Sequence, residues 1–312
     1  MSGTSVMEPN QVAGHGADGA SLKLNLTPLE RRDEIGPEDF FSAYFKPRRP
    51  LVFRSFSAEW PARKKWTLDY FRDTYGDISV PVYEEAFADS GASYGSTNDY
   101  MPFKDYLDLI EAGPTLKRLF LFNIFKHAPE LCHDFDFPKF ANRWAQRHPF
   151  MFFGGQTSYV DAHFDADMSN VFLTQFHGRK RILLYGPKWS NHLYRHKFTV
   201  SHNVDLGNPD FERYPRLAEA QGFECLLEDG DTVYMPSGYW HYVYYETGGF
   251  SLALRSPITG PVGRTHMLYR LLALAVGDHG LSKILGTKRW YGMKESMAQR
   301  KAARLPAPPI GD

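Results

Sequence analysis

The sequence is poor in cysteine, in long apolar runs and in net charge, and each shortage excludes a class of protein. Its 312 residues include two cysteines, Cys132 and Cys225, which lie far apart and in no metal-binding spacing. This count excludes a disulfide framework and favours a reducing compartment. No segment reaches the roughly 18 apolar residues that a membrane span requires. The 36 basic and 36 acidic residues balance, so no overall field attracts nucleic acid or an anionic membrane.

Residues 1–20 also lack an apolar run. They are rich in glycine, serine and alanine, which is typical of a disordered tail and not of a signal peptide. We therefore expect a cytoplasmic protein that makes no contact with a membrane. The remaining length suits one large domain or two small ones, and the 15% aromatic share predicts a core or cavity rich in rings.

Residues 21–149 have a mixed α/β pattern and are expected to pack on a core that follows them. Pro37 suits an early helical position, and Thr67 can cap a helix that follows it. Further expected elements are strands at Pro50–Phe53 and Ile78–Tyr83, and helices over 102–112 and 139–146.

Residues 150–258 change character, because short apolar runs recur between turns that contain glycine, proline or aspartate. Many short strands between turns are typical of a sandwich or barrel. We therefore predict a mainly β fold with flanking helices, whose core is an eight-stranded jelly roll, or double-stranded β-helix. The eight runs are Phe150–Phe153, Tyr159–Phe164, Asn170–Phe176, Lys180–Tyr185, Glu224–Leu227, Thr232–Met235, His241–Tyr245 and Gly249–Arg255.

Residues 259–305 return to a helical pattern, and they are strongly basic. Between Pro261 and Arg304 nine lysines and arginines face two acids, Asp278 and Glu295. A solvated helix face is the simpler interpretation, and a nucleic-acid contact is the alternative. The helical stripe is expected to pack on its own domain, with a dimer face as the second use. It consists of Met267, Leu268, Leu271, Leu272 and Ala275.

The segment Ala162-His163-Phe164-Asp165 carries the first candidate metal ligands. Side chains two apart on a strand share a face, so we expect His163 and Asp165 to point the same way. One further imidazole would complete a facial triad with open coordination positions, which suits non-haem Fe(II). His241 is the best candidate, because it opens a strand after the turn at Gly230-Asp231. The remaining candidates, interpreted as surface or supporting residues, are His177, His192, His196 and His202.

Strand alternation also predicts contacts for an anionic cosubstrate. If one register persists through Gly178, then Asn170, Thr174 and Lys180 face the same interior. A lone interior lysine is costly to bury unless an anion meets it, and a dicarboxylate would be such an anion. Arg255 shares its parity with His241 and can make a bidentate contact with a carboxylate. The alternatives are a solvent-facing Lys180 and an ion pair for Arg255 at the strand end.

Together these segments resemble the JmjC, or cupin-like, oxygenases that depend on Fe(II) and 2-oxoglutarate. The similarity is strongest to the small hydroxylase branch, which includes the asparaginyl hydroxylase of hypoxia-inducible factor and the hydroxylase of wybutosine in transfer RNA. It runs from about residue 35 to residue 258. The segments that carry it are Gly154 to Asp165, Gln175-Phe176-His177-Gly178-Arg179-Lys180, Gly230 to His241, and the insert from Asn203 to Pro215.

The resemblance implies roles for the candidate residues. His163, Asp165 and His241 would hold the iron, and Lys180 would pair with the distal carboxylate of 2-oxoglutarate. Asn170 would lie near the metal-chelating end of the cosubstrate. The chain departs from the branch where it has Phe120 in place of a tyrosine, Val160 in place of a serine or threonine, and Arg255 in place of an asparagine; we expect Arg255 to replace one missing donor.

The implied activity is hydroxylation of a protein or peptide side chain, with succinate and CO2 as coproducts. Demethylation would result if the oxidised carbon were an N-methyl group. A nucleoside in RNA and a small molecule are the alternative substrates. A cupin metalloenzyme that does not use 2-oxoglutarate, and a binding module without catalysis, are the alternative classes. The branch also suggests a homodimer formed through the C-terminal helices.

Overall fold

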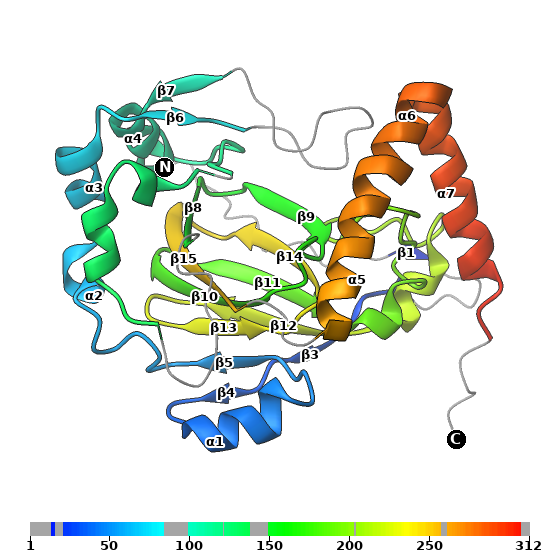
Figure 1. The fold of residues 1–312 in the computed structure, drawn as a ribbon, viewed down its shortest axis with the longest axis horizontal. Coiled ribbons are helices and arrows are strands. Elements are labelled where there is room, and N and C mark those ends of the chain that lie inside the picture. The colour runs from blue at the N-terminus through cyan, green and yellow to red at the C-terminus, as the bar shows by residue number, and fades with distance from the viewer. Residues whose placement is uncertain are drawn as a thin grey trace, which may run out of the picture.

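Two sheets face each other and enclose the centre of the molecule (Figure 1). The computed structural model describes residues 14–15, 21–83, 99–120, 122–137, 149–202, 204–256 and 261–306. One sheet has six strands in the order β4-β5-β13-β10-β15-β8, and the other has five in the order β3-β12-β11-β14-β9. Each contributes four strands to a jelly roll, so the predicted fold class is confirmed.

The eight core strands coincide with the eight runs expected from the sequence. They are β8 (Phe150–Gly154), β9 (Tyr159–His163), β10 (Asn170–His177), β11 (Lys180–Tyr185), β12 (Gln221–Leu227), β13 (Thr232–Met235), β14 (Trp240–Tyr245) and β15 (Gly249–Ser256). The sheets are extended at their edges by β3 (Asn25–Pro28), β4 (Arg31–Arg32) and β5 (Leu51–Phe53). Two small hairpins lie outside them, β1 (Gly14–His15) with β2 (Ser21–Leu22) and β6 (Ser79–Pro81) with β7 (Tyr100–Pro102).

Alternation along the strands sorts the apolar side chains into three layers. On β10, Val171 and Leu173 point between the sheets, whereas Phe172 and Phe176 belong to the cluster outside the six-stranded sheet. On β14, Val243 points between the sheets, whereas Trp240 belongs to the cluster outside the five-stranded sheet. Both sheets are therefore covered on their outer faces, and a third apolar layer lies between them.

The N-terminal part covers the outer face of the six-stranded sheet. Its helices are α1 (Pro37–Phe40), which continues as a π-helical turn over Phe41–Phe45, and α2 (Ala62–Lys65), α3 (Leu68–Tyr75) and α4 (Phe103–Ala112). Thr67 caps α3 as predicted, because its hydroxyl accepts a hydrogen bond from the Tyr70 amide. The expected helix over 139–146 lies outside the described residues, as does the tail over 1–20 apart from Gly14 and His15.

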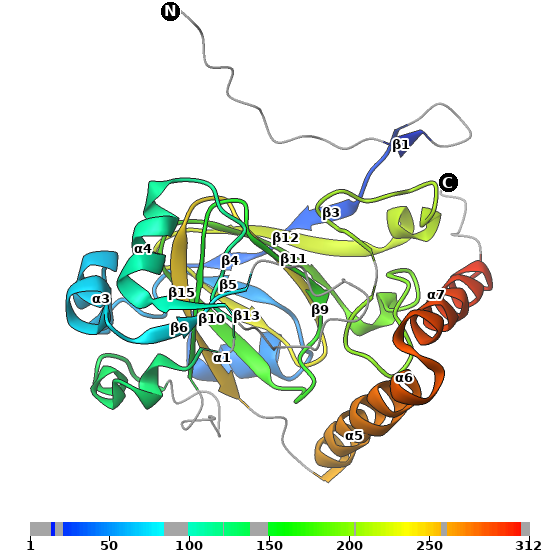
Figure 2. The ribbon, with the colours of Figure 1, turned by 90° about the horizontal axis from the view of Figure 1, so that it is seen from above.

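The C-terminal part forms a helical hairpin along one edge of the molecule (Figure 2). It contains α5 (Pro261–Leu272), a π-helical turn over Ala273–Asp278, α6 (His279–Leu285) and α7 (Thr287–Ala303). Ala298 and Ala302 of α7 pack in the cluster outside the five-stranded sheet. Apolar side chains that stay exposed on α5 and α6 include Leu268, Leu272 and Ile284, and a homodimer through these helices stays a prediction.

Among the helices that the structure describes, none combines the length and the apolar composition that crossing a bilayer takes.

The outward-facing rings of β10 pack against aromatic side chains of the N-terminal part. Phe172 is fully buried, with the rings of Phe40, Phe56 and Tyr234 at centroid distances of 5.9, 5.6 and 5.0 Å.

Replacing Phe172 by alanine should therefore destabilise the fold strongly. A buried phenylalanine of this kind is worth about 3–5 kcal/mol, because its loss leaves a cavity that the neighbouring rings only partly fill. The free energy of unfolding in urea measures the effect. Phe41→Ala, at a ring that is 43% exposed, serves as the matched control and should cost less than about 1 kcal/mol. Equal losses in the two variants would contradict the layered core.

Candidate metal centre

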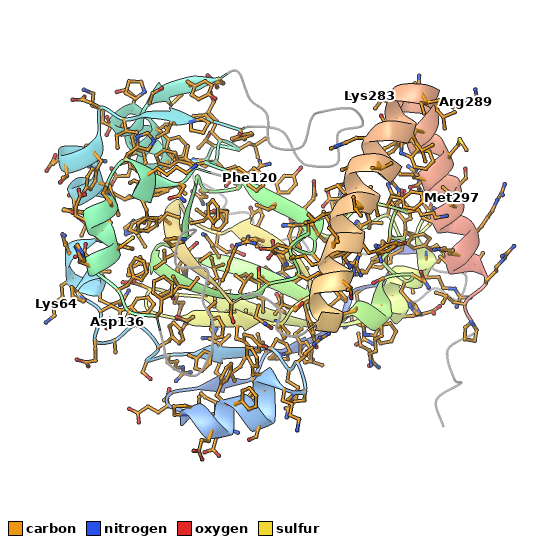
Figure 3. All side chains as sticks on the ribbon, in the orientation of Figure 1. Lys64, Phe120, Asp136, Lys283, Arg289 and Met297 are labelled. Atoms are coloured by element: carbon orange, nitrogen blue, oxygen red, sulfur yellow. The ribbon has the colours of Figure 1, made fainter. Side chains whose placement is uncertain are left out.

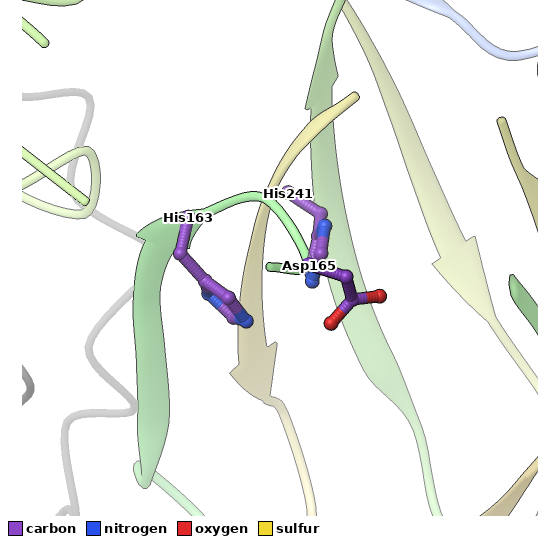
Figure 4. A group of neighbouring side chains, drawn as sticks. All are labelled: His163, Asp165 and His241. Carbon is purple, nitrogen blue, oxygen red and sulfur yellow. The ribbon is translucent and has the colours of Figure 1, made fainter. Parts of the chain in front are cut away.

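Two imidazoles and one carboxylate converge at one end of the space between the sheets (Figure 4). His163 ends β9, Asp165 follows it in the loop, and His241 is the second residue of β14. One ligand atom from each lies within 4.8 Å of the other two, and the imidazole centroids are 4.2 Å apart. Among the described residues, these three form the cluster of histidine, cysteine and carboxylate side chains with metal-binding geometry.

A bulge in β9 aims His163 into this site. His163 pairs with His241 and Val160 pairs with Val243, so three steps along β9 match two steps along β14. The extra residue brings Val160 and His163 onto the same cavity wall although their numbers differ in parity. Bulges near active sites often redirect a side chain in this way.

Asp165 reaches the site from a loop and not from a strand. The sequence predicted that strand alternation aligns it with His163, but β9 ends at His163. The following loop is held by the Phe164 amide, which donates to the Val200 carbonyl at 3.1 Å, and by the Met168 amide, which donates to the Asp165 carbonyl at 3.1 Å. The two side chains converge as expected, but for a different structural reason.

The protonation states of the three residues suit metal binding. The Nδ1 atoms of His163 and His241 lie 2.8 and 3.3 Å from the carbonyls of Asp161 and Tyr239, so Nδ1–H donates and Nε2 keeps its lone pair. Burial, with the neighbouring His241, lowers the pKa of His163 to about 3. Burial also lowers the pKa of His241. Both rings are therefore neutral donors at physiological pH.

Arg255 keeps the carboxylate of the site ionised. Burial by itself raises the pKa of Asp165, but Arg255 and the two histidines outweigh it and hold that pKa below its usual value. The guanidinium lies 3.2 Å from Asp165 and 3.2 Å from Asp167. Arg255 thus faces the cavity, as its parity predicted. Its contacts, however, are ion pairs with Asp165 and Asp167, which agrees with the alternative expectation of an ion pair at the strand end.

A cavity of about 770 Å³ connects this centre with the interior of the jelly roll. Its inner walls are apolar and come from both sheets, with Phe152, Val160, Val171, Leu173, Met235 and Val243. It continues past the centre to the C-terminal helices, where α5, α6 and α7 all contribute side chains. A space of this size suits a small ligand together with part of a larger substrate.

Lys180 is buried within this cavity. Its side chain is 1% exposed, its ammonium donates to Ser251 Oγ at 2.5 Å, and it lies 4.3 Å from the ring centroid of Tyr245. No carboxylate pairs with it among the described residues. Burial lowers its pKa well below the usual value. An ammonium in such a place calls for an anion.

Arg118, Ser251 and Tyr245 share this cavity with Lys180 and were not singled out from the sequence as site residues. Arg118 is 5% exposed, and burial lowers its pKa although Tyr245 and Asp161 oppose the shift. The signal that would have found Ser251 was its shared parity with Arg255 on β15. Phe120, which the sequence analysis aligned with a tyrosine of the hydroxylases, also lines the cavity; its side chain is labelled in Figure 3.

Asn170 and Thr174 do not line the cavity, so the prediction that they face it is wrong. They lie on the outer face of β10 with Phe172. The expected continuous register fails because β10 bulges between Gln175 and His177 and Lys180 begins a strand of the opposite sheet. Thr174 hydrogen-bonds Thr232. The side-chain Oδ1 of Asn170 accepts hydrogen bonds from the Ser237 amide and the Tyr234 hydroxyl, which fixes the turn that leads to His241.

The other histidines stay outside the centre. His177 is exposed, and His192 lies 3.7 Å from Glu219. His196 pairs with Glu295 of α7 at 2.9 Å. His202 is buried, which lowers its pKa to about 3, and its Nδ1 accepts from the Val204 amide. Both His196 and His202 line the cavity, in the part that continues toward the C-terminal helices.

The fold is a jelly roll, and its site is a cluster of two histidines and one carboxylate that could hold a metal ion. The chain belongs to the family described as the cupin-like domain, whose model matches residues 37–259. It is 28% identical to lysine-specific demethylase JMJ30 of Arabidopsis thaliana over 74% of this chain and 55% of that protein. For tRNA wybutosine-synthesizing protein 5 of Gallus gallus the identity is 28%, over 70% of this chain and 74% of that protein.

A third relative, lysine-specific demethylase 8 of Danio rerio, is 28% identical over 66% of this chain and 52% of that protein. The chain thus spans about half the length of these two demethylases. The predicted relationship to JmjC and cupin-like proteins is confirmed.

Removing a ligand should abolish metal binding without unfolding the chain. We expect Asp165→Ala and His241→Ala to weaken Mn(II) or anaerobic Fe(II) binding by more than about 100-fold, because each removes one of three donors. Isothermal titration calorimetry measures the affinity, and circular dichroism reports the fold. His177→Ala, at an exposed histidine, is the matched control and should bind as the wild type does. Undiminished binding in the Asp165 variant would exclude this centre.

Proposed function

We propose that the protein is an Fe(II)- and 2-oxoglutarate-dependent oxygenase that hydroxylates a C–H bond of a macromolecular substrate, with succinate and CO2 as coproducts. One observation carries the proposal: Lys180, a buried ammonium with no carboxylate partner among the described residues, shares a cavity with an open metal centre. A metal at one end of this cavity and the Lys180 ammonium further inside it match a ligand that has an acidic group at each end.

His163, Asp165 and His241 would hold the iron. Three protein donors leave about three positions of an octahedral ion open, which suits Fe(II) and not a closed structural zinc site. When bound, iron and 2-oxoglutarate would supply the chemistry that converts C–H into C–OH with dioxygen as the oxidant, one oxygen atom entering the product and the other entering succinate. The chain itself fixes the imidazole tautomers through the carbonyls of Asp161 and Tyr239 and orients the carboxylate through Arg255.

Lys180 would hold the distal carboxylate of 2-oxoglutarate, with Ser251 beside it. The ammonium already lies 2.5 Å from Ser251 Oγ, so both groups can donate to one carboxylate. Arg118 and Tyr245 border the same part of the cavity and would supply further donors in place of the tyrosine that Phe120 replaces. The apolar walls between this end and the metal would exclude water, which strengthens each polar contact.

Two substrate classes fit the proposal. A protein or peptide side chain is the first candidate, as the sequence analysis expected. Two of the three relatives described above are named lysine-specific demethylases. An RNA nucleoside is the second candidate. It is favoured by the match to tRNA wybutosine-synthesizing protein 5, which covers 74% of that protein against 52% and 55% of the two demethylases.

The protein loaded anaerobically with Fe(II) should release succinate from 2-oxoglutarate when oxygen is admitted, and a peptide or RNA library should accelerate the release. His163→Ala and Asp165→Ala should abolish turnover, because both remove iron ligands, while circular dichroism shows an intact fold. Succinate is measured by mass spectrometry. Turnover that persists in both variants would reject the assignment.

Replacing Lys180 by methionine should have opposite effects on cosubstrate binding and stability. We expect the 2-oxoglutarate dissociation constant of the Mn(II)-loaded protein to rise about tenfold to 100-fold, because a charge-assisted contact is lost. The protein without cosubstrate should melt at a higher temperature, because an uncompensated buried cation is gone. Since burial depresses the pKa of Lys180 in the folded state, wild-type stability should recover as pH rises toward the unfolded value of ~10.4.

Lys188→Met, at an exposed lysine, is the control for this experiment and should change neither property. An unchanged dissociation constant for Lys180→Met would remove Lys180 from the cosubstrate site. A wild-type protein that binds the metal but not 2-oxoglutarate would favour the alternative of a cupin metalloenzyme with a different cosubstrate.

A further inference from the structure

Two arginines stack on the ring of Phe164, the residue between the metal ligands His163 and Asp165. The guanidinium carbon of Arg195 lies 5.1 Å from the ring centroid, and that of Arg270 lies 4.7 Å from it. Arg195 comes from the segment that follows β11, and Arg270 comes from α5. The ring thus gathers two cations from segments about 75 residues apart in sequence, beside the site.

These two cations have no anionic partner among the described residues. Within the described part of the chain no carboxylate forms an ion pair with either or shifts the pKa of either, and both Nε atoms are buried without a hydrogen-bond acceptor. Burial lowers both pKa values, and the repulsion from Arg270 contributes to bringing the pKa of Arg195 to about 10. Like charges held together and partly desolvated are unfavourable unless an anion binds between them.

The pair lies beside residues that line the cavity with the candidate metal centre, although neither arginine lines it. Phe164, on whose ring both guanidinium groups lie, lines this cavity, and so do Leu271 and Leu274, which follow Arg270 along the helical segment. An anion held by Arg195 and Arg270 would therefore lie one residue layer from the cavity.

The surrounding helices extend the positive charge. Residues 261–304 carry nine basic and two acidic residues, and both acids are already engaged. Asp278 accepts from Lys294 and the Trp290 indole, and Glu295 accepts from His196, Arg213 and Tyr214. Lys283 lines the cavity from α6, near Arg289 at the tip of the helical hairpin (Figure 3).

We propose that Arg195 and Arg270 form a binding site for a phosphate group and that the ligand is a single-stranded nucleic acid, whose phosphodiester backbone continues along the basic C-terminal helices. The guanidinium pair provides paired donors of the geometry that phosphate oxygens accept. A chain of phosphates, and not one phosphorylated side chain, matches basic residues that are carried by all three helices: Arg270 of α5, Lys283 of α6, and the exposed Lys288, Arg289, Arg300 and Lys301 of α7. That this ligand is also the substrate rests on the proposed oxygenase function.

Binding can be tested without iron or turnover. Fluorescence anisotropy with a labelled 15-nucleotide single-stranded RNA measures the affinity of the full chain at several salt concentrations. We expect the double variant Arg195→Gln/Arg270→Gln to bind at least tenfold more weakly and to reduce the slope of log K against log salt by about 1. The DNA strand of the same sequence is the second arm and identifies which backbone is preferred.

The control carries the same change in charge away from the C-terminal helices. Arg48→Gln/Arg179→Gln removes two exposed arginines, one in the N-terminal part and one in the turn between β10 and β11, and it should weaken binding less than threefold. The single variant Arg270→Gln, on the surface helix α5, keeps the test valid should the double variant unfold, and it should weaken binding at least threefold. Thermal denaturation of each variant shows whether the fold is retained.

Two results would overturn the proposal. Equal weakening in the two double variants would mean that net charge alone attracts the strand and that no site exists at Phe164. Failure to bind either strand, with binding of a phosphopeptide that depends on Arg195 and Arg270, would assign the site to a protein partner. If RNA binds as expected but succinate release never depends on it, the anion site stands and its link to the oxygenase function falls.

Discussion

The burial of a lysine ammonium between two apolar sheets is the constraint on which the site depends. A double-stranded β-helix covered on both outer faces has a dry interior, and each polar group that points inward needs a partner there. The imidazoles find theirs in backbone carbonyls, and Asp165 finds its own in Arg255. Lys180 has the Ser251 hydroxyl, the Phe152 carbonyl and the Tyr245 ring, which contact its ammonium but carry no negative charge. An anion bound beside Lys180 would supply that charge.

The sequence was sufficient to predict the eight core strands and the three converging ligands, because turn residues and alternating apolar side chains are local signals. His241 could be paired with His163 since late and early strands adjoin in a jelly roll. Prediction failed where a side chain's direction depends on an irregularity. The bulge in β9 and the one between Gln175 and His177 both change which face a residue occupies, and neither has a clear local signature.

Asn170 illustrates how a correct alternation leads to a wrong assignment. Its neighbours alternate as expected, but the register breaks at the bulge between Gln175 and His177 and at the turn into the opposite sheet. Odd-numbered residues of β10 therefore point inward, whereas on β11 the even-numbered ones do. The side chain instead holds the Ser237 amide and the Tyr234 hydroxyl. Asn170 therefore contacts the turn that precedes β14, and through this turn it helps to position His241. Arg118, in contrast, carried no sequence pattern that distinguishes a buried arginine from an exposed one.

The candidate metal centre is also linked to the C-terminal helices, through the segment over 196–202. Val200 and Ser201 pair with Phe164 and His163, so the segment over 196–202 fixes the end of β9 and the loop that carries Asp165. The same segment is tied to α7 through His196 and Glu295. A ligand that binds against α5 to α7 therefore acts on a wall that is continuous with the metal loop. This continuity is a physical route by which occupation of the substrate side can change the geometry of the centre.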